Sequence, residues 1–232
     1  MPGISVVLPA YNEEENVGPA VMEAIEIAGS IADDYEVIVV DDGSRDSTAE
    51  KVRQLAERYP QVRLVQHEVN QGYGAALYSG FTSARKELVF FTDSDRQFDL
   101  TEIKKFLPFM NEYDLVIGYR APRRDPFMRK LNGWGWSALV TLLFGYTSRD
   151  IDCAFKLFRR EIMDRINVES RGATFSAEFL VRTKRAGYRI HEVPLAGHRP
   201  RVAGSPTGAR LGVITRAFRE LIRFRWRLWV EG

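Results

Sequence analysis

The chain has 232 residues, which allows one large domain or two small ones and is long enough for a substantial hydrophobic core. Hydrophobic residues make up 45% and charged residues 28%, which excludes a disordered, collagen-like or disulfide-rich protein. The single cysteine, Cys153, cannot form an internal disulfide, so the composition fits a reducing compartment. No secretion signal is evident at the N-terminus, and the longest nearly apolar stretch, Ala138 to Tyr146, is far shorter than the roughly 20 residues of a membrane-spanning helix.

Charge is distributed unevenly along the chain, although the net charge is only +2. From Arg199 to the C-terminus, eight arginines against two glutamates give +6, which leaves −4 for the preceding residues. An acidic body with a basic tail predicts anionic partners near the tail.

In the first half of the chain, β-branched runs alternate with segments of helical spacing. Such alternation predicts a mainly parallel sheet with helices on both faces, the α/β class. The expected strands are Ile4–Leu8, Glu36–Val40, Val62–His67, Leu88–Thr92 and Leu115–Gly118, and the expected helices are Asn16–Ala28, Thr48–Tyr59, Gly74–Ala84 and Leu100–Met110.

After Arg120 the alternation stops, and a basic loop leads into the aromatic segment Trp134–Phe144. We find no internal repeat or long linker, so we expect one domain over residues 1–212, divided at 118/119, followed by a basic aromatic helix over 213–232. The expected later elements are the strand Lys156–Arg159, the helix Ser176–Ala186, the strand Tyr188–Val193 and the tail helix Ile214–Val230.

Polar clusters follow three of the predicted strands at the point where each strand ends. A turn or helix cap would explain any one cluster, but ligands of open α/β sheets bind at the carboxyl ends of the strands, so three equivalent clusters predict a binding site. The clusters are Pro9, Ala10, Tyr11, Asn12 and Glu13; Asp41 and Asp42; and Asp93, Ser94 and Asp95.

Asp93 and Asp95 lie at alternate positions after an apolar strand, so both carboxylates can point into one crevice. Two adjacent anions favour a cation, and oxygen ligands of this kind suit Mg²⁺ or Mn²⁺ completed by water and substrate phosphate. The pattern therefore predicts a metal–diphosphate ligand.

Together these motifs resemble family 2 glycosyltransferases with the GT-A fold, of the dolichyl-phosphate mannose synthase-like, polyprenyl-phosphate kind. The resemblance runs from Ile4 to about Ser205. It implies that the PAYNEEEN and VVDDGSRDST segments hold the nucleotide, that the turn containing Gly72 lies on the donor side, and that Asp93-Ser94-Asp95 is the DxD motif, with Gln97 joining Asp95 on the metal.

The basic loop suits an acceptor that is itself a phosphate, because arginine forks bind phosphate oxygens in bidentate geometry; a solvated loop is the alternative. By resemblance, Arg120 and Arg129 are acceptor-phosphate ligands, Arg124 lies in the same loop, and Asp152 belongs to an acceptor-side DxxxFK pattern. Gly133 stands where relatives often have serine.

The remaining carried-over residues are Glu178, Arg201 and Ser205. Glu178 resembles the family's acidic residue ahead of the last strand, while a surface charge is the alternative. A phosphate acceptor is already ionised and needs no general base, so Glu178 could merely orient groups. Arg201 and Ser205 resemble a segment that closes over the donor diphosphate.

Aromatic residues alternate with arginines in the tail, a pattern typical of a helix at a bilayer interface. A helix packed on the body is the alternative. No nucleic-acid recognition motif accompanies the charge, so we do not expect nucleic acid as a partner.

These features predict an inverting, Mg²⁺- or Mn²⁺-dependent enzyme that moves a hexose from GDP-mannose or UDP-glucose to polyprenyl phosphate. We expect peripheral association with an anionic membrane surface, on the cytoplasmic face, with a separate transmembrane partner or a homo-oligomer left open. The alternatives are a sugar or protein hydroxyl acceptor and a catalytically silent membrane scaffold. No GxGxxG follows the first strand, which disfavours a dehydrogenase.

Overall fold

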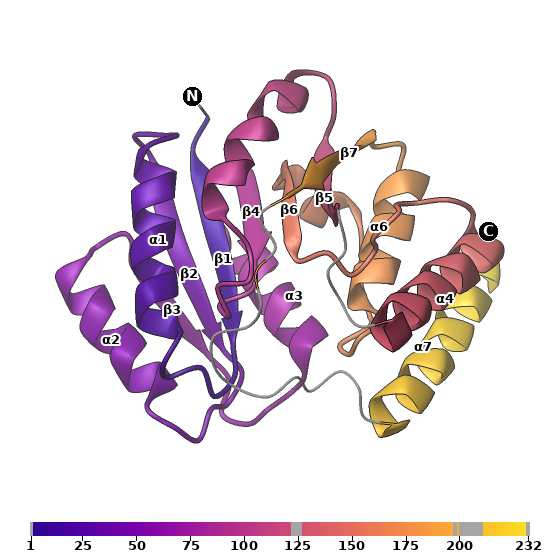
Figure 1. The fold of residues 1–232 in the computed structure, drawn as a ribbon, viewed down its shortest axis with the longest axis horizontal. Helices are drawn as coiled ribbons and strands as arrows, with labels where there is room; N and C mark the ends of the chain where they lie inside the picture. The colour runs from indigo at the N-terminus through magenta and orange to yellow at the C-terminus, as the bar shows by residue number, and fades with distance from the viewer. Residues whose placement is uncertain (1, 122–126, 197–198, 200–210, 231–232) are drawn as a thin grey trace.

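The computed structural model describes residues 2–121, 127–196, 199 and 211–230 (Figure 1). Seven strands form one sheet in the order β3-β2-β1-β4-β6-β5-β7. The strands are β1 (Ile4–Ala10), β2 (Tyr35–Asp41), β3 (Val62–Gln66), β4 (Leu88–Thr92), β5 (Leu115–Arg120), β6 (Phe155–Arg159) and β7 (Ile190–Leu195).

Helices follow most of the strands, as the alternating pattern predicts. Figure 1 shows α1 and α2 beside the N-terminal half of the sheet and α4 and α7 side by side beyond its other end. The helices are α1 (Val17–Gly29), α2 (Thr48–Arg58), α3 (Tyr73–Ser83), α4 (Phe127–Phe144), α5 (Glu161–Arg165), α6 (Phe175–Arg185) and α7 (Leu211–Val230), with the 3₁₀ helices η1 (Leu100–Lys105) and η2 (Leu107–Asn111).

The expected mainly parallel sheet is confirmed, with β6 as the exception. This strand runs antiparallel to both of its neighbours, and Phe155 at its start is paired with Thr92 at the end of β4. The residues that precede β6 therefore lie at the same edge of the sheet as the residues that follow β4 and β5. This reversal also brings the segment before β6 to the carboxyl ends of the parallel strands.

The predicted helix over Leu100–Met110 is wrong in type, because the segment forms two 3₁₀ helices. Pro108 has no N–H to donate to an α-helical hydrogen bond, so a continuous α-helix would lose a bond in its interior. Short 3₁₀ turns tolerate this loss, and they still bury Ile103 and Phe106 against the sheet.

Aromatic side chains fill both faces of the C-terminal half of the sheet. On one face, Phe81 of α3 makes ring contacts with Phe91, Phe158, Phe175 and Phe179 at centroid distances of 4.9–5.7 Å. A second group forms around Phe155, which contacts Phe90, Phe98 and Phe106. Edge-to-face packing of this kind fixes the strands that carry the site.

The tail helix is confirmed, and one of its faces packs on the body. Ala217, Leu221, Phe224 and Leu228 of α7 are buried, and Phe224 stacks on Phe144 of α4 with centroids 4.9 Å apart. Across the described residues, no helix combines the length and the apolar composition needed to span a bilayer.

Candidate functional site

Hydrogen bonds join the three predicted clusters at one edge of the sheet. The Asp42 backbone N–H donates to the Ala10 carbonyl at 2.9 Å, which ties the end of β2 to the end of β1. The Ser94 hydroxyl donates to the Pro9 carbonyl at 2.8 Å and ties the segment after β4 to the same strand. The structure therefore brings the three clusters together at one edge of the sheet.

Asn12 and Glu13 shape the turn between β1 and α1. Asn12 adopts a positive φ of 53°, its N–H donates to the Ser44 hydroxyl, and its side-chain oxygen accepts from the Arg45 N–H, both at 2.9 Å. The Glu13 N–H donates to the Thr48 hydroxyl at 2.9 Å, and its buried carboxylate accepts from a neighbouring amide. Both residues hold the β1 turn against the β2 turn, while Tyr11 between the strand and this turn is 36% exposed.

Asp41 is fully buried at the end of β2 and retains one unpartnered oxygen. Its Oδ1 accepts from the Ser44 N–H at 3.2 Å, whereas its Oδ2 has no hydrogen-bond partner among the described residues. A buried carboxylate oxygen without a partner is costly, and an N–H or O–H of a ligand would relieve that cost.

Asp42 organises the neighbouring loop instead. Its two oxygens accept from the backbone N–H groups of Gln71 and Gly72 at 2.9 and 2.8 Å, and its Oδ1 lies 2.7 Å from Nδ1 of His67. The other ring nitrogen of His67 is 2.9 Å from the Ser79 hydroxyl of α3. Gly72 has a φ of 103°, a conformation that only glycine adopts readily. This glycine therefore allows the sharp turn by which the loop enters α3.

The carboxylates after β4 form the candidate metal site. Asp95 is 7% exposed and its Oδ1 accepts from the Gln97 N–H at 3.2 Å, while the Gln97 side-chain amide donates to the Arg199 carbonyl at 3.1 Å. The described residues contain no group of three or more His, Cys, Asp and Glu side chains able to hold a metal. Two carboxylates with an amide oxygen nonetheless fit Mg²⁺ or Mn²⁺, which takes its remaining ligands from water and substrate phosphate.

Tyr73, the first residue of α3, connects the donor-side loop to this pair. Its hydroxyl donates to Asp93 Oδ1 at 2.8 Å, and its ring contacts Phe91 of β4. Desolvation of the hydroxyl, followed by the charges of Asp93, Asp152 and Asp95, raises the pKa of Tyr73 well above its ordinary value, although 42% of the residue is exposed. The phenol therefore stays a hydrogen-bond donor, and the charges of Asp93, Asp95 and Asp152 all act on this one hydroxyl.

Arg120, at the end of β5, is held in a bidentate ion pair with Asp150. Its Nε and Nη2 donate to the two carboxylate oxygens at 2.8 and 2.9 Å, and both side chains are at most 10% exposed. A bidentate pair of this kind fixes the orientation of the guanidinium. The site thus combines a group of carboxylates with a positioned arginine.

The family model for glycosyl transferase family 2 matches residues 5–166. The chain belongs to this family. It is 33% identical to a dolichyl-phosphate beta-glucosyltransferase of Trichomonas vaginalis, over 82% of this chain and 62% of the relative. It is also 33% identical to a dolichyl-phosphate hexose transferase of Haloferax volcanii, over 83% of this chain and 81% of the relative. The chain thus spans less than two thirds of the length of the Trichomonas protein.

Solved structures share the fold of this family 2 glycosyltransferase. A glucosyl-3-phosphoglycerate synthase from Mycobacterium tuberculosis, in complex with Mn²⁺ and UDP-glucose, matches 97% of this chain and 79% of its own with a TM-score of 0.72 at 22% identity. A mannosyl-3-phosphoglycerate synthase from Rubrobacter xylanophilus matches 99% of this chain and 74% of its own with a TM-score of 0.74 at 18% identity. These likenesses confirm the expected GT-A architecture.

Glu178 of the glycosyltransferase lies in a buried network between α6 and α7. Its carboxylate has no exposed surface and accepts hydrogen bonds from Ser170, Arg182 and Arg227 at 2.5–3.2 Å. Burial opposes ionisation, but the hydrogen bonds from Ser170 and Arg182 outweigh it and lower the pKa of Glu178. The geometry favours the orienting role over proton transfer.

Several predicted residues lie outside the described part of the chain. They are Arg124, Arg201 and Ser205, together with the side chain of Arg129, whose backbone belongs to α4. Their roles stay predictions.

Two site residues escape the sequence reasoning, namely His67 and Asp150, whereas Tyr73 belongs to the turn with Gly72 that the resemblance places on the donor side. His67 follows β3 and obeys the same strand-end rule as the other clusters, so that rule could have found it. Asp150 stands two residues before Asp152, but its ion pair with Arg120 spans 30 positions and has no local signal.

Proposed function

We propose that this glycosyltransferase transfers a hexose from a nucleoside-diphosphate sugar to a polyprenyl phosphate at the cytoplasmic face of a membrane. The observation that carries the proposal is the presence, at one edge of the sheet, of the carboxylates that follow β4 and of Arg120, oriented by Asp150, at the end of β5. The carboxylates suit a metal-bound diphosphate, and the guanidinium suits a second, separate phosphate. The names of the relatives, dolichyl-phosphate transferases, support this acceptor class.

On the donor side, Asp93, Asp95 and Gln97 would hold Mg²⁺ or Mn²⁺. The metal supplies positive charge that stabilises the departing nucleoside diphosphate. The unpartnered Asp41 oxygen would accept from the nucleoside, beside the half-exposed Tyr11. GDP-mannose and UDP-glucose are the proposed donors. The glucosyltransferase names of the Trichomonas relatives and the UDP-glucose in the mycobacterial structure favour the second.

On the acceptor side, Arg120 holds the lipid phosphate, with Arg124 and Arg129 as further proposed ligands. A phosphate monoester is ionised at neutral pH, so its oxygen attacks the anomeric carbon without a general base. The bond from this carbon to the diphosphate oxygen breaks in the same step, and the configuration inverts. Glu178 acts as an orienting residue in this scheme, and Asp152 would guide the sugar.

An open groove along α4 gives the prenyl chain a place to lie. It measures about 520 Å³ and is mostly apolar, and two of its lining residues, Ser148 and Arg149, directly precede the Asp150 that pairs with Arg120. Its lining residues are Trp134, Ser137, Ala138, Thr141, Leu142, Tyr146, Ser148 and Arg149.

The face shared by α4 and α7 is the proposed membrane contact. Phe218, Ile222 and Trp226 recur every four residues on α7, with Trp229 three positions further, and all are 45–73% exposed. Trp134 and Leu142 of α4 are 69% and 82% exposed. Exposed aromatic and aliphatic side chains among arginines suit the headgroup region of an anionic bilayer. A separate transmembrane partner or a second copy would be compatible with such peripheral binding.

The deciding experiment is transfer of labelled sugar into a chloroform-soluble product. Purified protein is incubated with polyprenyl phosphate, Mg²⁺ or Mn²⁺ and single GDP- or UDP-sugars. We expect transfer from one donor, abolished by chelation of the metal and lowered at least about 100-fold by Asp95→Asn. Asp164→Asn, an exposed carboxylate on α5, serves as the control.

The alternatives give different results in the same assay. Transfer only to a sugar or protein hydroxyl would replace the lipid-phosphate acceptor. Metal-dependent nucleotide binding without any transfer would indicate a silent scaffold and would contradict the proposal.

A further inference from the structure

A second cavity lies between the C-terminal end of α4, α6 and α7, outside the site described above. It measures about 210 Å³. Its wall is apolar except for two arginines, one from α6 and one from α7. The lining residues are Leu143, Phe144, Val181, Arg185, Arg225 and Leu228.

The two arginines of this cavity differ from their neighbours on the same helices. Arg182 and Arg227 are engaged by the buried carboxylate of Glu178. Arg185 makes only a long hydrogen bond of 3.5 Å, to the Leu228 carbonyl, and Arg225 has no hydrogen bond or ion pair with any described residue. Two guanidinium groups with available donors therefore face one small cavity.

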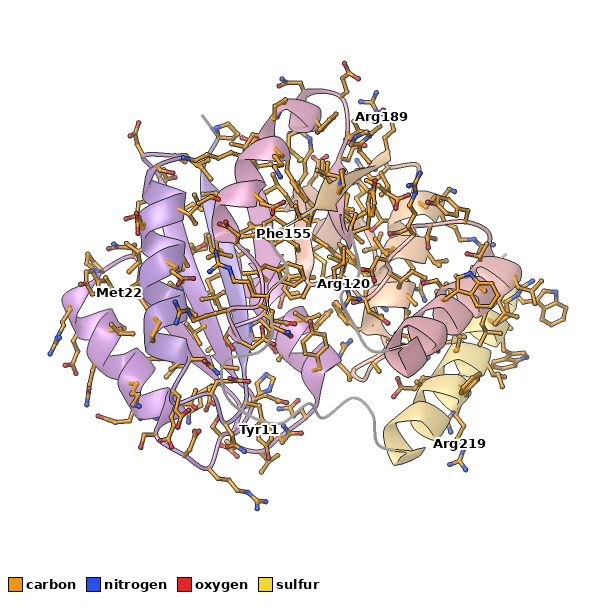
Figure 2. All side chains as sticks on the ribbon, in the orientation of Figure 1. Tyr11, Met22, Arg120, Phe155, Arg189 and Arg219 are labelled. Atoms are coloured by element: carbon orange, nitrogen blue, oxygen red, sulfur yellow. The ribbon has the colours of Figure 1, made fainter. Side chains whose placement is uncertain are left out.

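The cavity adjoins the exposed apolar face. Arg225 immediately precedes Trp226 and stands one turn before Trp229, and Leu143 follows the 82% exposed Leu142. Figure 2 draws the exposed side chains of α4 and α7 projecting from this end of the molecule. Any amphiphile resting on that face would bring its polar end close to Arg225.

We propose that this cavity binds the phosphate group of an anionic phospholipid. Arg185 and Arg225 would hold the phosphate oxygens through their forked donors, and Leu143 and Leu228 would contact the adjoining hydrocarbon. A free phosphate would use the arginines but not the apolar wall, so the combination favours a lipid. The inference rests on the proposed membrane contact of α4 and α7 and adds a defined headgroup site to it.

The test compares two pairs of Arg→Lys substitutions, both of which keep the net charge. Arg185→Lys/Arg225→Lys keeps the net charge but removes both forks, whereas Arg219→Lys/Arg223→Lys makes the same change at two exposed arginines of α7 that do not line the cavity. Binding to vesicles of phosphatidylcholine with about one third phosphatidylglycerol is measured by sedimentation. We expect the cavity pair to lower the affinity about tenfold and the control pair to leave it within about twofold.

The outcomes separate this inference from the proposed function. Equal affinities for wild type and both variant pairs would show diffuse attraction and overturn the site. Failure of the wild type to bind vesicles at all would remove the membrane contact itself, while sugar transfer to a short-chain acceptor in detergent would still report on the enzyme.

A second measurement compares how well glycerol phosphate and vesicles each protect Arg225 from an arginine-modifying reagent. Equal protection by the two would assign the cavity to soluble phosphates and overturn the lipid site. Binding of a short RNA duplex in place of vesicles, with the same sensitivity to Arg→Lys, would also overturn it.

Discussion

Tyr73 links the nucleotide side of the site to the metal side through one hydrogen bond. It begins α3, directly after a loop that Asp42 holds by two backbone N–H groups, and its hydroxyl reaches Asp93. The loop and Asp93 are therefore connected through Tyr73, so we expect a change in the loop conformation to alter the hydrogen bond that Asp93 accepts. His67 lies within hydrogen-bond distance of both Asp42 and the Ser79 hydroxyl, and it thereby helps to fix Asp42, which holds this loop.

Replacing Tyr73 with phenylalanine tests this link. The ring can keep its contact with Phe91, while Asp93 loses a hydrogen bond. A hydrogen bond to a charged group contributes about 1.5–3 kcal/mol, so we expect the Kd for nucleotide with Mn²⁺ to rise roughly tenfold or more at unchanged thermal stability. Calorimetry with Mn²⁺ measures the change. Tyr78→Phe, on the same helix, should bind as the wild type does, and equal affinities for all three proteins would show that Tyr73 has no part in positioning Asp93.

Asp150 fixes the orientation of Arg120, the proposed ligand of the acceptor phosphate. In Asp150→Asn the guanidinium loses its charged, bidentate partner and gains rotational freedom. We expect KM for polyprenyl phosphate to rise about tenfold, while donor affinity stays unchanged because Asp150 lies outside the metal pair. Steady-state kinetics with each substrate varied in turn separates the two effects. A rise in donor KM alone would assign Asp150 to the donor side instead.

At the scale of elements, α7 is joined to the body through a buried ion-pair network. Glu178 of α6 bonds Arg182 of its own helix and Arg227 of α7, and Arg227 also lies 3.3 Å from Glu169. The loop that carries Glu169 and Ser170 continues to Arg171, whose carbonyl accepts from the Ala75 N–H of α3. The tail helix thus rests on the segment that supports the donor-side helix.

This network predicts a loss of stability in acid. The pKa of Glu178 is lowered in the folded protein, so its ionised form contributes stability that is present above the unfolded value of about 4.5 and is lost as the pH falls through the folded pKa. We expect Glu178→Gln to cost about 3 kcal/mol at pH 7, because Arg182 and Arg227 lose the buried carboxylate that lies between them. The difference from wild type should shrink as the pH falls below 4.5. Thermal unfolding at both pH values measures it, and a constant difference would contradict the assignment.

For the whole molecule, the separation of a catalytic edge from an apolar face predicts that membrane binding and chemistry can be changed independently. Deleting α7 would expose the core positions Leu221 and Phe224, so substitutions of exposed side chains are the cleaner test. We expect Trp226→Ser/Trp229→Ser to lower vesicle affinity about tenfold or more and to leave turnover of a short-chain acceptor in detergent unchanged.

Met22→Ser is the matched control for this prediction. Met22 is a 40% exposed apolar side chain on α1, which lies beside the other half of the sheet (Figure 1). It should bind vesicles as the wild type does. If it weakened binding as much as the tryptophan variant, the contact would not be confined to α4 and α7.

The sequence by itself determined most elements and the donor-side clusters of the site. Hydrophobic periodicity is local, and polar residues at the ends of parallel strands meet wherever the sheet forms, so Asp41, Asp93 and Asp95 could be placed without coordinates. The helix over Leu100–Met110 failed because Pro108 interrupts a pattern whose spacing is otherwise helical.

Only the tertiary structure decided the partners of these residues. The reversal of β6 brings Asp150 to Arg120, the packing of α3 across β1 and β2 brings Tyr73 to Asp93, and the docking of α7 encloses Glu178. These pairs are 20–49 residues apart in sequence. Contacts at such separations depend on how whole elements pack, which no short-range periodicity encodes.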